Sequence, residues 1–163
     1  MPRPNIAWRI ISRLWGLSMG SPKFLFYKEL DRWEGCSTKF ISTYGFNYVV
    51  IDRVGTWLDK SKHPWVYPNV DEALADPDHV GDTWVWLDAN ATTYLDEYAH
   101  PTNNVIYCVG SNYDGFDGKD ISTLPGVKLR LRQPVRHVGE WFAGMVIACV
   151  CYDRFLYLNG RRL

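Results

Sequence analysis

Apolar positions along the chain fall into short continuous runs separated by stretches with helical spacing. The runs predict five buried strands, at Lys23–Tyr27, Asn47–Asp52, Thr83–Leu87, Asn104–Val109 and Val127–Leu131. Spacing by four and capping residues predict three helices, at Gly35–Tyr44, Val70–Ala75 and about Gly139–Leu158. Strands that alternate with helices and are apolar throughout predict an α/β fold, with a mainly parallel sheet and helices on both faces.

Residues 1–21 precede the first predicted strand and form a basic N-terminal arm. Its arginines are interleaved with tryptophan, isoleucine and leucine, which predicts an amphipathic helix. The arm could cover the domain, contact a protein partner or lie on RNA, and Arg9 and Arg13 are its candidate RNA-binding residues. Because it lacks a continuous apolar stretch and a cleavage site, it does not read as a secretory signal. Residues 22–163 are expected to form one α/β domain.

Charge is balanced overall but segregated along the chain. The 163 residues contain 18 Lys and Arg and 18 Asp and Glu, which excludes a uniformly basic nucleic-acid-binding coat. Residues 1–65 hold ten basic and five acidic side chains. Residues 66–127 hold one basic and eleven acidic side chains, and residues 128–163 hold seven basic and two acidic ones. The basic ends would form a dipolar surface if they meet in space; alternatively, the acidic middle is a solvated loop region.

The cysteines show no metal-binding or redox spacing. No pair among Cys36, Cys108, Cys149 and Cys151 forms a C-x-x-C motif, so we expect free thiols, no zinc and a reducing, cytoplasmic location. Asp114 and Asp117 lack the spacing of a calcium loop, and no metal is predicted. The longest apolar run, of about 12 residues, is too short to cross a membrane.

Candidate chemistry follows the carboxyl ends of the predicted strands, where α/β folds bind ligands. Gly110 and Gly115 bound the loop after Val109 and would let its backbone approach a ligand closely, although an ordinary turn looks the same locally. Before the last helix lie three arginines and a histidine that could grip RNA phosphates or a cofactor carboxylate: Arg130, Arg132, Arg136 and His137. The alternation of the first two with leucines is equally consistent with one face of a strand.

Three stretches together resemble a known family. They are H-P-T-N-N-V-I-Y-C-V-G-S-N-Y-D-G at His100–Gly115, Y-D-R at Tyr152–Arg154 and Y-G-F at Tyr44–Phe46. Over about residues 22–158 the chain is similar to the SpoU (TrmH-like) branch of the SPOUT RNA methyltransferases. The resemblance implies a C-terminal trefoil knot, a homodimer packed partly through the last helix, and methyl transfer from S-adenosylmethionine to a ribose 2′-hydroxyl of tRNA or rRNA.

The resemblance also implies which residues form the cofactor site. The matching positions are Leu87, Asp88, Gly110, Asn112, Gly115, Leu131, Trp141 and Phe142. Lys39 occupies the position of the arginine that activates the ribose hydroxyl in the family, and we take Lys39 and Arg136 as candidate catalytic residues.

Four changes, one of them a two-residue pair, depart from the family pattern at motif positions. Trp33 replaces an asparagine, Lys39 an arginine, Ser111-Asn112 a Pro-Glu pair, and Phe142 a second asparagine. The alternative is therefore a catalytically inactive SPOUT-fold protein that binds RNA, or a protein partner, through the arm or an aromatic loop. That loop runs from Thr56 to Pro68, and its Trp57 and Trp65 could stack on bases or on a partner.

Overall fold

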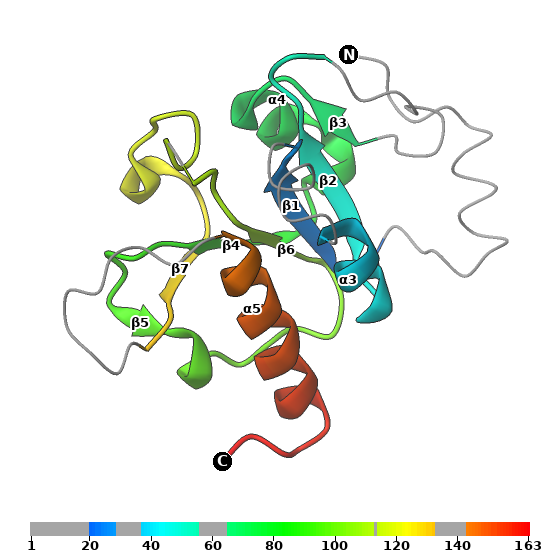
Figure 1. Ribbon diagram of the computed structural model, residues 1–163, viewed down its shortest axis with the longest axis vertical. Helices are drawn as coiled ribbons and strands as arrows, with labels where there is room; N and C mark the ends of the chain where they lie inside the picture. Colours follow the sequence, from blue (N-terminus) through cyan, green and yellow to red (C-terminus); the bar gives the residue numbers. More distant parts are fainter. Residues whose placement is uncertain (1–19, 29–36, 56–64, 113, 133–142) are drawn as a thin grey trace, which may run out of the picture.

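The computed structural model describes residues 20–28, 37–55, 65–112, 114–132 and 143–163. One seven-stranded sheet forms its centre, and neighbouring strands are parallel throughout (Figure 1). The order across the sheet is β3-β2-β1-β6-β4-β7-β5. The strands are β1 (Lys23–Tyr27), β2 (Asn47–Ile51), β3 (Val66–Tyr67), β4 (Thr83–Leu87), β5 (Thr93–Tyr94), β6 (Val105–Cys108) and β7 (Val127–Arg130).

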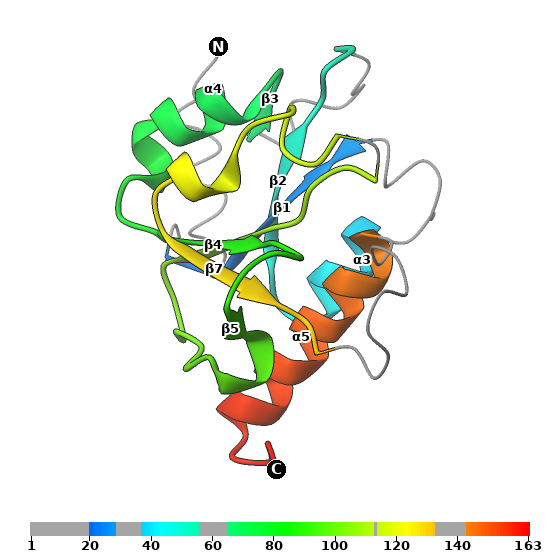
Figure 2. The same cartoon turned by 90° about the vertical axis from the view of Figure 1, so that its left-hand side faces the viewer.

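Helices cover both faces of this sheet. The α-helices are α3 (Ser37–Thr43), α4 (Val70–Ala75) and α5 (Ala143–Leu158), and short 3-10 turns are η1 (Pro77–His79), η2 (Leu95–Glu97) and η3 (Ile121–Thr123). α3 and α5 lie side by side on one face and α4 lies on the other (Figures 1 and 2). The predicted α/β fold, with a parallel sheet and helices on both faces, is confirmed.

The five predicted strands are all present; two have the predicted bounds, and the ends of the other three differ by at most one residue. Two strands of two residues each, β3 and β5, were not predicted, because runs this short carry no periodicity. Asn69 caps α4 as predicted, its side chain accepting a hydrogen bond from the Glu72 amide at 2.9 Å. The described part of the last helix begins at Ala143; its predicted first residues lie outside the described ranges.

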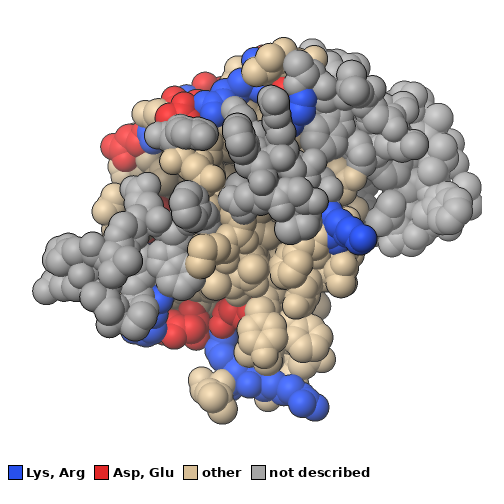
Figure 3. Space-filling view, viewed as in Figure 1, with Lys and Arg blue, Asp and Glu red and all other residues tan. Residues whose placement is uncertain are grey.

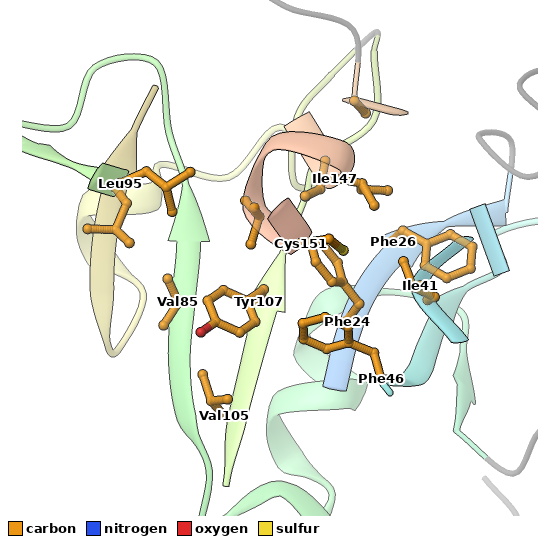
Figure 4. Close-up of a cluster of buried hydrophobic side chains, with 14 of the residues drawn as sticks. Phe24, Phe26, Ile41, Phe46, Val85, Leu95, Val105, Tyr107, Ile147 and Cys151 are labelled. Carbon is orange, nitrogen blue, oxygen red and sulfur yellow. The ribbon is translucent and has the colours of Figure 1, made fainter. Parts of the chain in front are cut away.

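Alternate side chains of the strands build two apolar cores. Phe24, Val85 and Tyr107 point toward α3 and α5, where Ile147 and Cys151 of α5 pack against them (Figure 4). The intervening residues point toward α4 and form the second core; they include Leu25, Val49, Trp84, Trp86 and Ile106. Because both faces are buried, the strands read as continuous apolar runs rather than as alternating patterns.

The three tryptophans that the structure describes are core residues rather than an exposed stacking surface. Trp84 and Trp86 are buried and stack at 5.5 Å between ring centroids, as their shared strand face predicted. The proposed stacking role of Trp65 is wrong: only 5% of the residue is exposed, and its Nε1 donates a hydrogen bond to Asp78 Oδ2 at 3.2 Å. Trp57 lies outside the described residues.

In the folded chain, basic side chains from the two ends of the sequence lie beside acidic side chains from its middle. Basic side chains from both ends of the chain form ion pairs with the acidic middle, at Lys23–Asp82, Arg53–Asp114 and Arg132–Asp96. Figure 3 accordingly shows blue and red groups side by side at the upper and lower edges of the molecule. In the described residues the acidic middle is therefore partly neutralised by the ends, rather than being a separate solvated loop.

Two of the stretches that carry the family resemblance are bound to each other. His100 Nε2–H donates to Asp153 Oδ2 at 2.7 Å, and its Nδ1 accepts from the Tyr107 hydroxyl at 2.7 Å. Arg154 Nη2 donates to the carbonyl oxygens of Pro101 and Thr102 at 3.2 and 2.9 Å. This His100–Arg154 clasp fixes the second half of α5 to the segment that enters β6.

A second buried polar cluster lies under α4 and η1. Lys23 Nζ, fully buried, pairs with Asp82 Oδ2 at 2.7 Å and donates to His79 Nδ1 at 3.2 Å. Because lysine only donates, the imidazole accepts at Nδ1, and its Nε2–H faces the Tyr67 hydroxyl at 2.8 Å. Tyr67 in turn donates to Asp76 at 2.6 Å. Every member has a partner, as buried polar groups require.

Described cysteines and acidic groups show no metal site. Cys108, Cys149 and Cys151 are free thiols, and burial raises the pKa of each. Within the described ranges, no three His, Cys, Asp or Glu side chains are grouped to hold a metal ion. No described helix is long and apolar enough to span a bilayer.

The two buried histidines predict a pH dependence of stability. Burial lowers the pKa of His79 and of His100. Their contribution is therefore complete above the unfolded value of about 6.5 and is lost as pH falls below it. We expect the free energy of unfolding, measured by urea denaturation, to fall between about pH 7.5 and about pH 5.5. A free energy that stays constant or rises over this range would contradict the assignment of neutral imidazoles.

Candidate functional site

Three adjacent strands bring the predicted cofactor loops to one edge of the sheet. β4 lies between β6 and β7, with Trp86 opposite Cys108 and Leu87 opposite Leu129. The segments that follow these strands therefore emerge side by side at the carboxyl edge. The predicted cofactor positions that the structure describes lie on these segments; they are Leu87, Asp88, Gly110, Asn112, Gly115 and Leu131.

The loop after β6 is closed by its two glycines. The Ser111 amide donates to Gly115 O at 2.8 Å, and residues 111 and 115 form an antiparallel bridge. A Cβ on Gly110 would lie 2.9 Å from the Gly115 carbonyl carbon, so only glycine fits there. Gly115 has φ +60°, and, its chain neighbours apart, no described atom lies within 4 Å of the place where its Cβ would be. Among the described residues, the space beside the Gly115 backbone is therefore open.

Asn112 joins this loop to the start of α5. Its Oδ1 accepts a hydrogen bond from the Ala143 amide at 2.9 Å. The first amides of a helix have no partner within the helix, so the asparagine acts as a cap supplied from a distant loop. The neutral amide that departs from the family pattern at this position thus has a defined structural task.

The side walls of the edge are apolar and ordered by backbone hydrogen bonds. Leu87 and Leu131 are half-buried where β4 and β7 end. The Asp88 amide donates to Leu129 O at 2.8 Å, and Asp88 Oδ1 accepts from the Asn90 amide at 2.9 Å. Asp88 therefore shapes the turn that carries Leu87 to the edge.

One residue of this edge escaped the sequence analysis. Arg53, directly after β2, donates from Nη1 to Asp114 Oδ2 at 2.6 Å, and Ser111 Oγ donates to Asp114 Oδ1 at 2.6 Å. The Ser111 and then the Arg53 hydrogen bond hold the pKa of Asp114 below its usual value. Residues 53 and 114 are 61 positions apart, and no motif links them, so only the strand order could have paired them.

Lys39 is exposed on the first half of α3. α3 connects two parallel strands, β1 and β2, so it runs against them and begins toward the carboxyl edge. Figure 2 shows α3 beside the first turns of α5. Lys39 is therefore on the half of its helix that is nearer to the loops described above.

The two described arginines at the end of β7 have partners on the protein. Arg132 Nε donates to both Asp96 oxygens at 3.0 and 2.8 Å, and its Nη2 pairs with Glu97. The guanidinium groups of Arg130 and Arg132 lie 5.2 and 3.9 Å from the centre of the Tyr94 ring. Leu129 before them is buried and Leu131 between them is half-buried, as the alternating strand face predicted. These arginines bind η2 and β5, so an RNA phosphate would have to compete with carboxylates for Arg132.

Several predicted site residues lie outside the described residues: Arg9, Arg13, Trp33, Arg136, His137, Trp141 and Phe142. The roles given to them stay predictions.

The groups at this edge suit S-adenosylmethionine, which presents an apolar adenine ring beside ribose and amino-acid groups. The half-buried leucines at positions 87 and 131 would hold the ring, and the open backbone at Gly115 would approach its polar edges.

Comparison with known proteins bears on the fold. No protein-family model matches the sequence, and no curated protein matches it. Solved structures do match. A protein from Bacillus anthracis described as an RNA methyltransferase has a TM-score of 0.67 and 14% identity, covering 85% of this chain and 94% of its own. The chain has the fold of an RNA methyltransferase.

Two further structures share this methyltransferase fold. One, which concerns 2-OH methylation of C/U34 on tRNA, has a TM-score of 0.67 and 16% identity over 88% of this chain and 100% of its own. The other, a methylase family protein from Haemophilus influenzae Rd KW20, has a TM-score of 0.55 and 12% identity over 87% of this chain and 68% of its own. The resemblance seen in the sequence is thus confirmed at the level of fold.

The closed loop after β6 predicts that any side chain at position 110 lowers the free energy of unfolding. We expect Gly110→Ala to lower the free energy of unfolding by about 1–3 kcal/mol, because its Cβ collides with backbone at Gly115. Gly81→Ala is the matched control, since no described atom beyond its chain neighbours lies within 4 Å of its Cβ position. Urea denaturation of both variants measures the difference. Equal stabilities would contradict the closed loop.

Proposed function

We propose that the protein is an S-adenosylmethionine-dependent methyltransferase acting on a ribose 2′-hydroxyl of RNA, with its cofactor site at the carboxyl edge of β4, β6 and β7. The observation that carries the proposal is that the segments after β4, β6 and β7 are neighbours at one edge of a methyltransferase fold, and that the Asn112–Ala143 hydrogen bond ties the middle one to α5. The tRNA 2-OH methylation named for one structural neighbour supports tRNA as the first substrate class to test.

The residues of this edge have distinct tasks in the proposed reaction. When bound, S-adenosylmethionine supplies an electrophilic methyl group. Leu87 and Leu131 would exclude water, and the loop of Gly110 and Gly115 would offer backbone groups to the cofactor. Lys39 would hold an RNA phosphate or, through its positive charge, stabilise the ribose oxygen as the hydroxyl proton passes to water. We keep Arg136 as a second candidate for that role, on the basis of its sequence position.

Lys39 gives a direct test of this assignment. We expect Lys39→Ala to lower methyl transfer to total tRNA by about tenfold or more, because a positioned cation near the hydroxyl is lost, while binding of S-adenosylmethionine stays unchanged. Lys39→Arg keeps the charge and is expected to retain activity. Transfer of a labelled methyl group and calorimetry with the cofactor measure the two effects. Full activity in Lys39→Ala would remove Lys39 from the mechanism.

A second candidate function is an inactive protein that keeps the fold for binding. Two observations favour it: Asn112 is engaged in capping α5, and Arg132 is engaged by Asp96 and Glu97. In that case, calorimetry would show no binding at millimolar cofactor. The basic arm and a protein or RNA partner would then be the subject to pursue.

The proposal includes a homodimer and the trefoil knot that the family resemblance implies. The outer face of α5 is apolar, with Met145, Tyr152, Phe155 and Leu158 exposed to between 39 and 56%. Beside it, a cavity of about 240 Å³ opens between α3 and α5, lined in part by Tyr44, Phe155 and Leu158. A second copy of the chain packed on α5 would cover this surface.

The dimer predicts that a charge on α5 dissociates it. We expect Phe155→Glu to weaken self-association by at least tenfold, because a carboxylate would be buried against an apolar surface. Val80→Glu is the control, since Val80 is 84% exposed elsewhere on the molecule. Light scattering during size-exclusion chromatography reports the mass of each. A wild-type chain that runs as a monomer at high micromolar concentration would overturn the dimer.

A further inference from the structure

The loop after β6 is held at three places by groups that belong to other elements. Asn112 caps α5 as described above. The side chain of Asp117, near the end of the loop, accepts from the Val70 amide at the start of α4 at 2.9 Å. Between these points, the only described contact that reaches Asp114 from another element is Arg53, which joins the loop to the end of β2.

The arginine is itself held in place. Its guanidinium carbon lies 4.8 Å from the centre of the Tyr27 ring, at the end of β1, and Nη1 lies 3.7 Å from Asp117 Oδ1. Asp114 passes the restraint on, because its second oxygen accepts from Ser111 Oγ and its carbonyl oxygen accepts from the Gly118 amide at 2.9 Å. A restraint on Asp114 therefore acts on the whole turn from Ser111 to Gly118.

The exposure of the pair argues for positioning rather than for stability. The side chains of Arg53 and Asp114 are 28 and 44% exposed. Solvent-exposed ion pairs contribute little to the free energy of unfolding. Their geometry can nevertheless select one shape of a surface loop, because the alternative shapes of a short glycine-bounded loop differ little in energy.

We infer that Arg53 is a positioning residue that, through Asp114, holds the loop of residues 110–118 in the shape that accepts the methyl donor. This inference rests on the proposed function, since the loop is the proposed cofactor loop. It adds the end of β2, which lies three strands from β4 in the sheet, to the elements that set affinity for S-adenosylmethionine. Arg53 itself need not touch the cofactor.

The test compares the whole chain with Arg53→Ala, with the shape-conserving Asp114→Asn and with the reversed pair Arg53→Asp/Asp114→Arg. Lys119→Ala is the matched control, because it removes another surface ion pair, with Asp71 at 2.9 Å, next to the same loop. Three quantities are measured: the dissociation constant for S-adenosylmethionine, the hydrogen-exchange rates of the Ser111 and Gly118 amides, and the thermal midpoint.

In both single-site variants we expect exchange at Ser111 and Gly118 to rise by about three- to tenfold and cofactor affinity to fall by a similar factor, with an almost unchanged thermal midpoint. The reversed pair should recover part of the exchange protection and part of the cofactor affinity. Lys119→Ala should change neither the exchange rates nor the affinity. Unchanged amide exchange at Ser111 and Gly118 in Arg53→Ala would overturn the inference, whether or not the affinity for the cofactor changes. If the wild type fails to bind cofactor, the proposed function fails, and the positioning of the loop by Arg53 is still decided by the exchange rates. Faster amide exchange in the variants, with an unchanged dissociation constant for S-adenosylmethionine, would contradict the claim that the shape of this loop sets the affinity for the methyl donor.

Discussion

The hydrogen bonds between the segment that enters β6 and the second half of α5 are the constraint on which the rest of the site depends. His100 and Arg154 make these bonds from opposite sides, the first to Asp153 and the second to two backbone carbonyls. A 16-residue helix anchored in its second half has little freedom at its first turn. The amide of Ala143 is therefore brought to the carboxyl edge, where Asn112 accepts its hydrogen bond.

The polar side chains of the His100–Arg154 clasp can be buried at little cost because each of them has a partner. A neutral His100 donates at one nitrogen and accepts at the other, while Arg162 pairs with the same Asp153 oxygen at 2.5 Å. The charge of Asp153 is thereby matched by that of Arg162, while the Arg154 guanidinium donates to the two backbone carbonyls. Since α5 covers the core face of β1, β4 and β6, loss of the clasp would loosen the sheet and the site together.

The sequence predicted the strands and helices whose signals lie within one element. It did not predict the strands and side-chain contacts that depend on residues far apart in the chain. Apolar runs located all five long strands, and Asn69 located α4, because these signals lie within one element. The two-residue strands β3 and β5 exist only through pairing with their neighbours. Trp65 looked like a loop aromatic because no local signal showed that Asp78 would receive its indole N–H. The glycine loop was found, whereas its link through Arg53 required knowledge of the strand order.

The most direct test of the account is to locate the methyl donor on the protein by nuclear magnetic resonance. S-adenosylmethionine is titrated into the isotopically labelled chain, and the shifts of assigned backbone amides are followed. We expect the largest changes at Asp88, at the loop from Gly110 to Gly115 and at Leu131. Changes confined to other surfaces, or no changes at millimolar cofactor, would contradict the claim that the carboxyl edge of β4, β6 and β7 is a methyl-donor site.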